Sequence, residues 1–242
     1  FFMRFLTFED AAAASRAAAE VFAETVRRKP DCVLGLATGS SPLALYGVLC
    51  EEYRAGRLDF ARVRTVNLDE YVSLSPDHPE SYRYFMNKNL FDRINIDKKN
   101  TLVPRGDAAD PAAEAASYDA RCAAFGQVDV QLLGVGNNGH IAFNEPDDAL
   151  LLPTHVTALT PSTIAANARF FASEDEVPRE AITMGIGSIL RAKKIVLLAF
   201  GRAKHAALEA LQDDRITTAV PATLLKLHPD VTVYCDKEAF AG

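Results

Sequence analysis

Short apolar runs of strand length alternate with helix-like segments along most of the chain, and this alternation restricts the possible folds more than any other feature. The strands are expected at residues 33–36, 63–68, 128–135, 195–200 and 231–235. They are nearly continuous in Val, Leu and Ile, which is typical of strands buried on both faces of a sheet. The helices are expected at residues 9–28, 42–54, 80–91, 111–125, 202–211 and 221–226. The pattern predicts an α/β protein with three αβα layers, in which a mostly parallel, Rossmann-like sheet carries helices on both faces.

The chain has 242 residues, about half of them apolar, which suits one domain with a large core. We find no Ser/Gly/Pro-rich linker, so we expect a single domain over residues 1–242. Residues 161–184 fit the alternation poorly because their polar and aromatic side chains show weak periodicity. Long irregular insertions are often lids or binding loops, and a plain surface excursion is the alternative.

Charge and the apolar pattern exclude several classes of partner. The formal net charge of −6 argues against nucleic acid and anionic membranes, so a local cluster of cations and N–H groups must hold any anionic ligand. No apolar run approaches the roughly 20 residues of a membrane span, and we see no signal peptide, so we expect a cytoplasmic protein. Phe1 and Phe2 precede Met3, which is the expected natural start.

The cysteine pattern indicates the redox state of the chain. The four cysteines are widely scattered: Cys32, Cys50, Cys122 and Cys235. This spacing fits neither a structural zinc site nor a disulfide framework, so we expect reduced and mostly buried thiols.

Ligands of open parallel sheets lie beyond the carboxyl ends of the strands, so the residues after each predicted strand are the candidate site. The first strand is followed by Thr38, Gly39, Ser40, Ser41 and Pro42. Gly39 allows a tight turn, the hydroxyls and backbone N–H groups suit an anion, and Ser41 is the expected N-cap of a helix that begins at Pro42. The segment is therefore either a phosphate-binding loop or an ordinary capped helix start.

The second and fourth strands are followed by charged side chains. Asp69 and Glu70 end the second strand, where an unpaired carboxylate is costly to bury. Because successive side chains on a strand point in opposite directions, we expect only one of them to face the cleft. A cap or a salt bridge is the alternative. After the fourth strand, Arg202, Lys204 and His205 begin a helix, where cations oppose the helix dipole unless an anion is bound.

The third strand leads into LLGVGNNGHIAFNEP, in which Gly134, Gly136 and Gly139 match the dinucleotide fingerprint G-x-G-x-x-G. That fingerprint needs the glycines to open a helix and an acidic residue about 20 positions later. Here HIAFNEP shows no helical periodicity and the later VTALTPS has no carboxylate, so we exclude a nicotinamide site. The turn carries these polar residues instead: Asn137, Asn138, His140, Asn144 and Glu145. A His near a carboxylate can form an acid–base pair, and a structural loop His is the alternative.

Hydroxyls, a carboxylate, a His/Glu pair and cations together suit cofactor-free proton transfer on a small phosphorylated substrate, such as sugar isomerisation. Five stretches occur in order: GLATGSSP, NLDEYVSLSPDHPESYRYFM, LLGVGNNGHIAFNEP, ANARFF and FGRAKHAAL. Over nearly the whole chain they resemble the glucosamine-6-phosphate deaminase family. The first loop alone is also similar to that of 6-phosphogluconolactonases.

The resemblance implies an enzyme that converts glucosamine 6-phosphate to fructose 6-phosphate and ammonia with neither cofactor nor metal. By motif, it implies that Asp69 moves the C2 proton to C1, that His140 opens the sugar ring and that Glu145 is the partner of His140. The substrate-binding residues that it implies are Thr38, Gly39, Ser40, Ser41, Gly136, Arg169 and Lys204. Arg169 would lie in a lid around residues 155–184, and Glu70 is assigned to structure.

One residue departs from part of the family, and two other functions remain open. Some members have Asp where this chain has Asn138, whose amide can orient His140 but cannot accept a proton. Longer members continue into a tail that serves hexamer assembly and activation by N-acetylglucosamine 6-phosphate, so the resemblance implies an unregulated monomer. A sugar-phosphate lactonase would not need Asp69 as a carbon base. A sugar-phosphate sensor would need neither Asp69 nor the pair of His140 and Glu145.

Overall fold

A seven-stranded sheet forms the centre of the protein, in the order β1-β10-β9-β6-β2-β3-β5, and every neighbouring pair is parallel. The computed structural model describes residues 3–242, so the expectation about Phe1 and Phe2 lies outside the described residues. The strands of this sheet are β1 (Met3–Phe8), β2 (Val33–Leu36), β3 (Arg64–Asn67), β5 (Thr101–Leu102), β6 (Val130–Gly134), β9 (Ile195–Ala199) and β10 (Val231–Asp236). All five expected strands are present, and the predicted α/β class is confirmed.

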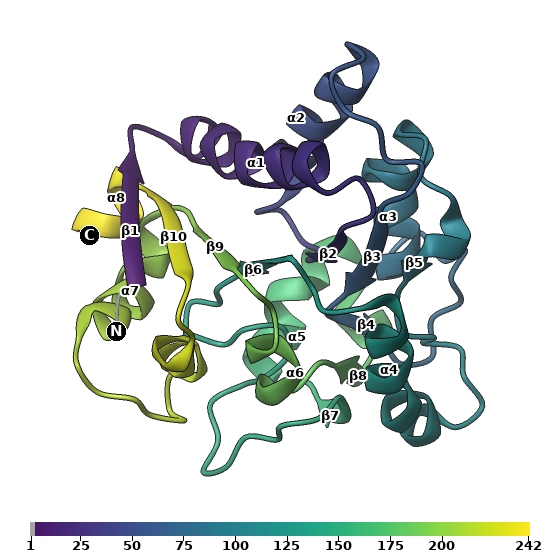
Figure 1. Cartoon of the computed structure of the whole chain (residues 1–242). Helices are drawn as coiled ribbons and strands as arrows, with labels where there is room; N and C mark the ends of the chain where they lie inside the picture. The colour runs from purple at the N-terminus through teal and green to yellow at the C-terminus, as the bar shows by residue number, and fades with distance from the viewer. Residues whose placement is uncertain (1–2) are drawn as a thin grey trace.

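Helices cover both faces of this sheet. They are α1 (Ala11–Arg28), α2 (Leu43–Arg54), α3 (Tyr82–Asn89), α4 (Pro111–Phe125), α5 (Pro161–Asn167), α6 (Ile186–Leu190), α7 (His205–Gln212) and α8 (Lys237–Ala241). Short 3-10 turns are η1 (Phe91–Arg93), η2 (Lys98–Asn100), η3 (Ala168–Phe170), η4 (Glu174–Glu176), η5 (Arg202–Lys204) and η6 (Pro221–Leu227). Helices α1 and α2 lie on one side of the sheet and α6 on the other, which gives the predicted three layers (Figure 1).

The structure differs from the prediction at both ends of the chain: one predicted helix is of another type, and one strand was not predicted. Residues 221–226 form the 3-10 turn η6 and not an α-helix, because the Thr223 hydroxyl donates to the carbonyl of Val220 and accepts from the N–H of Thr217, which holds the chain in a tight turn. Strand β1 was not predicted. It lies at the sheet edge, where it pairs only with β10 among the described strands, and it is about half exposed. An edge strand needs no continuous apolar run like that of the central strands, and the sequence MRFLTF has none.

A second, antiparallel sheet of three strands lies beside the first, and the sequence did not predict it. Its order is β4 (Asp69–Tyr71), β8 (Glu180–Thr183) and β7 (His155–Ala158). These strands are three or four residues long, too short for a period-2 pattern to stand out. Tyr71 of β4 and Ala181 of β8 belong to a separate apolar cluster whose other buried members are Phe143, Leu159, Ile164 and Val177. The weakly patterned residues 161–184 thus begin after β7 and include β8.

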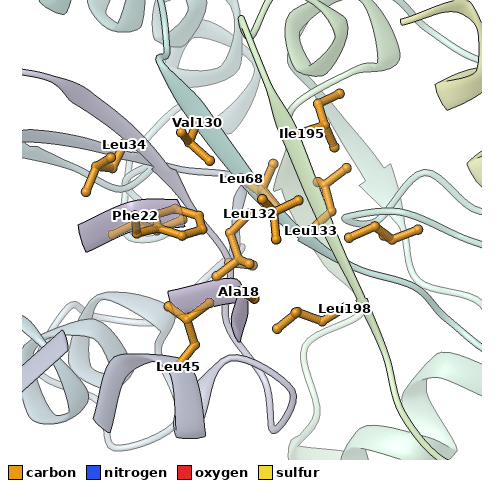
Figure 2. Close-up of a cluster of buried hydrophobic side chains, with 14 of the residues drawn as sticks. Ala18, Phe22, Leu34, Leu45, Leu68, Val130, Leu132, Leu133, Ile195 and Leu198 are labelled. Carbon is orange, nitrogen blue, oxygen red and sulfur yellow. The ribbon is translucent and has the colours of Figure 1, made fainter. Parts of the chain in front are cut away.

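The main core lies between the large sheet and its helices. Figure 2 shows Ala18 and Phe22 of α1 near Leu34 of β2 and Leu132 of β6. Ala18 is fully buried, and its small side chain lets the helix approach the sheet closely. Each fully buried side chain of the size of Leu or Phe contributes about 1.5–3 kcal/mol of hydrophobic stabilisation.

All four cysteines are free and buried, as the sequence predicted. Of the helices in the part of the chain that the structure describes, none combines the length and the apolar character that crossing a bilayer requires.

The strand order places the candidate segments at one edge of the sheet. From β2 the chain proceeds outward to β3 and β5, whereas β6 lies on the other side of β2 and is followed outward by β9 and β10. The topological switch point therefore lies between β2 and β6, where open α/β sheets bind their ligands. The carboxyl ends of four adjacent strands, β9, β6, β2 and β3, meet there. They lead respectively to Lys204, His140, Thr38 and Asp69.

Candidate active site

Asp69 is the first residue of β4, directly after the short connection from β3. Its side chain is buried, with 6% of the residue exposed. Burial is the main cause that raises the pKa of Asp69 to about 8, and the neighbouring charge of Glu70 adds to the effect. A carboxyl group with such a pKa can both accept and return a proton near neutral pH.

Unlike Asp69, the neighbouring Glu70 is bound to the backbone. Its carboxylate accepts hydrogen bonds at 2.9 Å from the backbone N–H groups of Tyr71, Tyr82 and Arg83, so it caps the first turn of α3. Burial raises the pKa of Glu70 to about 7, although the three N–H groups favour the ionised form. This agrees with the assignment of Glu70 to structure and leaves Asp69 as the carboxylate available for chemistry.

The glycine turn after β6 holds a histidine. A side chain at Gly136 would place a Cβ 2.2 Å from Cε1 and 2.3 Å from Nδ1 of His140. Gly139 has φ +80°, and a Cβ there would lie 2.3 Å from the side chain of Val220. Residues 135–154, all of them described, form no helix, so the helix that a dinucleotide fingerprint requires does not follow β6. The glycines serve the His140 turn.

His140, Asn138 and Glu145 form a hydrogen-bonded chain. Nδ1 of His140 lies 2.8 Å from Oδ1 of Asn138 and 3.3 Å from Oε2 of Glu145. The Asn138 amide nitrogen donates to the same Oε2 at 2.8 Å. Because the Asn138 oxygen and the Glu145 carboxylate can only accept, Nδ1 of His140 is assigned the proton and Nε2 is left as an acceptor. The His140 side chain stays about one-quarter exposed.

Glu145 is kept ionised by its neighbours. Burial alone would raise the pKa of Glu145, but hydrogen bonds from His140, Thr163 and Asn138 outweigh it and lower the pKa to about 2. Its Oε1 atom accepts from the hydroxyl of Thr163, while Oε2 accepts from Asn138. A fixed negative charge beside His140 stabilises the imidazolium that forms when His140 takes up a proton.

The loop after β2 has the predicted hydroxyls but not the predicted cap. Gly39 adopts φ +91°, and the Tyr46 hydroxyl donates to the carbonyl of Ala37 at 2.6 Å. The expected N-cap role of Ser41 is wrong: α2 begins at Leu43 with Pro42 at the N-cap position and no side-chain capping bond. Pro42 already has helical backbone angles, φ −79° and ψ −10°, so the chain has turned into the helix one residue after Ser41.

Two cations lie near each other: Lys204, which follows β9, and Arg169 in η3. The Lys204 ammonium donates to the side-chain oxygen of Asn137 at 2.6 Å. Burial, and then the charge of Arg169, lowers the pKa of Lys204. An anion between two such cations would relieve this repulsion. His205, in contrast, turns toward the C-terminal helix α8, with Nδ1 at 3.1 Å from the carbonyl of Ala239.

The turn of His140 and the strand of Asp69 share one partner. Thr183 on β8 pairs with Asp69 in the small sheet, and its hydroxyl accepts the N–H of Phe143 at 3.1 Å. The rings of Tyr71 and Phe143 pack with their centroids 5.8 Å apart. The two segments therefore lie on the same side of the molecule, as convergence at the sheet edge predicts.

Sequence reasoning missed Thr163 and Thr160, which lie at the start of α5. The signal was present as T-P-S-T, a Thr N-cap followed by Pro in the first helical position. Among residues 3–242, no three His, Cys, Asp or Glu side chains gather into a group that could hold a metal ion.

A parallel sheet with an acid–base chain and a lysine beyond the carboxyl ends of its central strands, and with a second cation near that lysine, is the arrangement of an α/β enzyme that acts on a small anionic ligand. Residues 8–234 match the family described as glucosamine-6-phosphate isomerases/6-phosphogluconolactonase, and the chain belongs to this family.

Individual proteins are similar to this chain in sequence and in structure. The chain is 52% identical over 237 residues to a glucosamine-6-phosphate deaminase of Clostridium perfringens, with 98% of each chain covered. It is 54% identical over 225 residues to one of Thermoanaerobacter pseudethanolicus, covering 93% of this chain and 89% of the relative. A solved structure of a monomeric glucosamine-6-phosphate deaminase superposes with TM-score 0.95 at 43% identity, with 98% of both chains covered. The 6-phosphogluconolactonase of Trypanosoma brucei shares the fold, with TM-score 0.77 at 19% identity over 99% of this chain and 98% of that one.

Proposed function

We propose that this chain converts glucosamine 6-phosphate and water to fructose 6-phosphate and ammonia. The observation that carries the proposal is the placement of a buried Asp69 and the chain of His140, Asn138 and Glu145 at the carboxyl ends of neighbouring strands. The relatives that match over nearly the full chain are named for the same reaction.

Ring opening is assigned to His140. Nε2 accepts the proton of the C1 hydroxyl, and the imidazolium returns a proton to the ring oxygen as the C1–O5 bond breaks. The ionised Glu145, linked through Asn138, stabilises the positive charge of the imidazolium. The product of this step is the open-chain amino aldehyde.

Isomerisation is assigned to Asp69. Its carboxylate removes the proton from C2 while the carbonyl oxygen on C1 takes a proton from the ammonium group on C2, which gives an enol with the hydroxyl on C1 and the amine on C2. The same carboxyl group then protonates C1, so that C2 becomes an iminium carbon. Water adds to C2 and ammonia leaves, which gives the ketone of fructose 6-phosphate. A pKa of about 8 suits a group that takes and returns one proton.

Phosphate binding is assigned to the loop after β2 and to the two cations. Thr38, Ser40 and Ser41 would offer hydroxyls, Gly39 its backbone N–H, and Lys204 and Arg169 their charges. Gly136 would line the sugar site while leaving room for His140. The segment around residues 155–184, which holds Arg169, would act as a lid on one domain that spans the chain.

Lys204→Ala is expected to raise KM about ten- to hundredfold and leave kcat largely unchanged. The reason is that a hydrogen bond to a charged group contributes about 1.5–3 kcal/mol and the phosphate is bound equally in substrate and transition state. Steady-state kinetics test this expectation. Arg202→Ala is the matched control, because Arg202 shares the turn η5 but is exposed. A fall in kcat at constant KM would contradict the role of Lys204.

Gly136→Ala is expected to lower kcat about a hundredfold, because the added Cβ displaces the His140 ring from Asn138 and a misplacement of about 1 Å has costs of that order. Thermal melting and kinetics on the same sample separate this effect from unfolding. Gly47→Ala is the control, since a Cβ at Gly47 in α2 meets nothing within 4 Å. Full activity of the Gly136 variant would show that activity does not depend on the contact between the His140 ring and Asn138.

The direct test of the function is release of ammonia from glucosamine 6-phosphate, without added nucleotide or metal. Hydrolysis of 6-phosphogluconolactone is assayed in parallel, because the lactonases share the fold. Ammonia release with no lactonase activity supports the proposal, and the reverse result assigns the chain to the lactonase branch of its family.

We further infer a monomeric, cytoplasmic enzyme without activation by N-acetylglucosamine 6-phosphate. The solved structure with TM-score 0.95 supports the monomeric state, since it is that of a monomeric glucosamine-6-phosphate deaminase. Sedimentation should give the mass of one chain, and the rate should depend hyperbolically on substrate. A stable hexamer, or a sigmoidal curve that the N-acetyl sugar phosphate abolishes, would overturn the inference.

A further inference from the structure

We propose that Thr163 is a positioning residue for the acid–base pair: its hydroxyl fixes the carboxylate of Glu145, so that Glu145 and Asn138 hold the His140 ring in the orientation for ring opening. The proposal rests on the proposed deaminase function and adds a residue that lies outside the glycine turn.

Each oxygen of the Glu145 carboxylate has its own partners. Oε2 accepts from Asn138 at 2.8 Å and lies 3.3 Å from Nδ1 of His140. Oε1 accepts from the hydroxyl of Thr163, and the Thr160 hydroxyl lies 3.5 Å from the same atom. A carboxylate held at both ends cannot rotate about its last bond. The Thr163 hydroxyl therefore fixes the position of Oε2, on which the amide of Asn138 depends.

The hydroxyl of Thr163 is separable from the folding of α5. The N-cap of this helix is Thr160, whose hydroxyl accepts the N–H of Thr163 at 3.2 Å. Loss of the Thr163 hydroxyl removes the 3.0 Å hydrogen bond that it accepts from the Thr160 hydroxyl, but it leaves the capping bond to the Thr163 N–H in place. Thr163 is 7% exposed, and Val has nearly the same shape as Thr, so Thr163→Val fills the same space and removes the hydroxyl that donates to Glu145.

The same helix also reaches the strand of Asp69. Asn167 lies four residues after Thr163, on the same face of α5, and its amide donates to the Tyr71 hydroxyl at 2.9 Å. Tyr71 is the last residue of β4, which begins at Asp69. Arg169 follows in η3. One face of α5 thus contacts both the turn of His140 and the strand of Asp69. In the sequence, this helix directly precedes Arg169, the cation assigned to the phosphate.

The test compares Thr163→Val, Thr163→Ser and the wild type in the ammonia assay. Thr163→Val should lower kcat about tenfold or more, a usual cost for a lost supporting hydrogen bond, with KM within about twofold. Thr163→Ser should restore kcat to within about threefold. The linear amino alcohol made by reducing glucosamine 6-phosphate needs no ring opening, so its Kd should be the same for all three proteins. Thr157→Val, on the strand before α5, is the control for the substitution itself.

Three results would overturn the proposal: an unchanged kcat in Thr163→Val, an equal loss in Thr163→Ser, or a change confined to KM. Thr163→Ala replaces Thr163→Val if the latter does not fold. In a Glu145→Gln background the Thr163 substitution should have no further effect on kcat, and an additive loss would also count against it. Failure of the wild type to release ammonia would refute the proposed function and is distinct from these outcomes.

Discussion

Asp69→Asn should abolish turnover, with a loss in kcat of about a thousandfold or more, while binding of the reduced, linear amino alcohol phosphate stays within about threefold of the wild type. Asn keeps the size of the side chain but cannot accept the C2 proton, and loss of a general base costs up to about 10⁴-fold. Exchange of the C2 hydrogen with deuterated water isolates the step. A variant that still exchanges this hydrogen would refute the role of Asp69 as the base.

The same substitution should also change the stability of the protein, by an amount that becomes more favourable to the variant as pH rises. The pKa of Asp69 is raised to about 8 in the folded state, mainly by burial, whereas in the unfolded chain it is near 4. The folded state therefore loses stability as pH rises from about 4 to about 8, because the unfolded chain ionises first. Asn carries no such charge. The free energy of unfolding of Asp69→Asn relative to wild type should rise over this range and level off above it, as urea titrations at several pH values would measure.

The place of the site followed from the sequence because a parallel sheet brings its strand ends together. Apolar runs located β2, β3, β6 and β9, and the residues after them included Thr38, Asp69, His140 and Lys204. The choice between Asp69 and Glu70 was not available from spacing, because the two are adjacent. It depends on three backbone N–H groups that converge on Glu70, and two of them belong to residues of α3 that follow a long loop.

What the sequence missed depends on short segments that pair across long separations. Strand β4 has three residues, and its partner β8 lies more than 100 positions later in the chain. No local pattern encodes such a pairing, yet it brings Thr183 between Asp69 and the turn of His140. The contact of Thr163 with Glu145 has the same origin, since it depends on where α5 packs.

The sequence indicated that Asn138 contacts His140, but it did not give the geometry of the contact. The sequence placed an amide next to His140 and suggested that it orients the imidazole. The structure places this amide between the two groups, with its oxygen toward Nδ1 of His140 and its nitrogen toward Glu145. An amide in that position can orient the His140 ring relative to Glu145, but it cannot transfer a proton between them. In the proposed mechanism, proton transfer is therefore assigned to Nε2 of His140, which has no hydrogen-bond partner in this chain of contacts.

His140→Gln should lower kcat for glucosamine 6-phosphate by about a hundredfold or more, since loss of an acid–base group costs about 10²–10⁴-fold. The assignment of His140 to ring opening makes a sharper expectation possible. A substrate analogue that lacks both the C4 and the C5 hydroxyls can close neither a furanose nor a pyranose ring, so the variant should deaminate it at nearly the wild-type rate. Asp69→Asn should fail on both substrates, because the C2 proton must still be removed.

The comparison of these two variants on two substrates separates the two proton transfers of the reaction. Rescue of His140→Gln alone places His140 before the open-chain aldehyde and Asp69 after it. If the open-chain analogue rescues neither variant, His140 acts in the isomerisation itself, and the hydrogen-bonded chain to Glu145 supports the carbon chemistry instead of ring opening. If it rescues both, Asp69 is not the carbon base, and the buried carboxylate at the start of β4 must have another role.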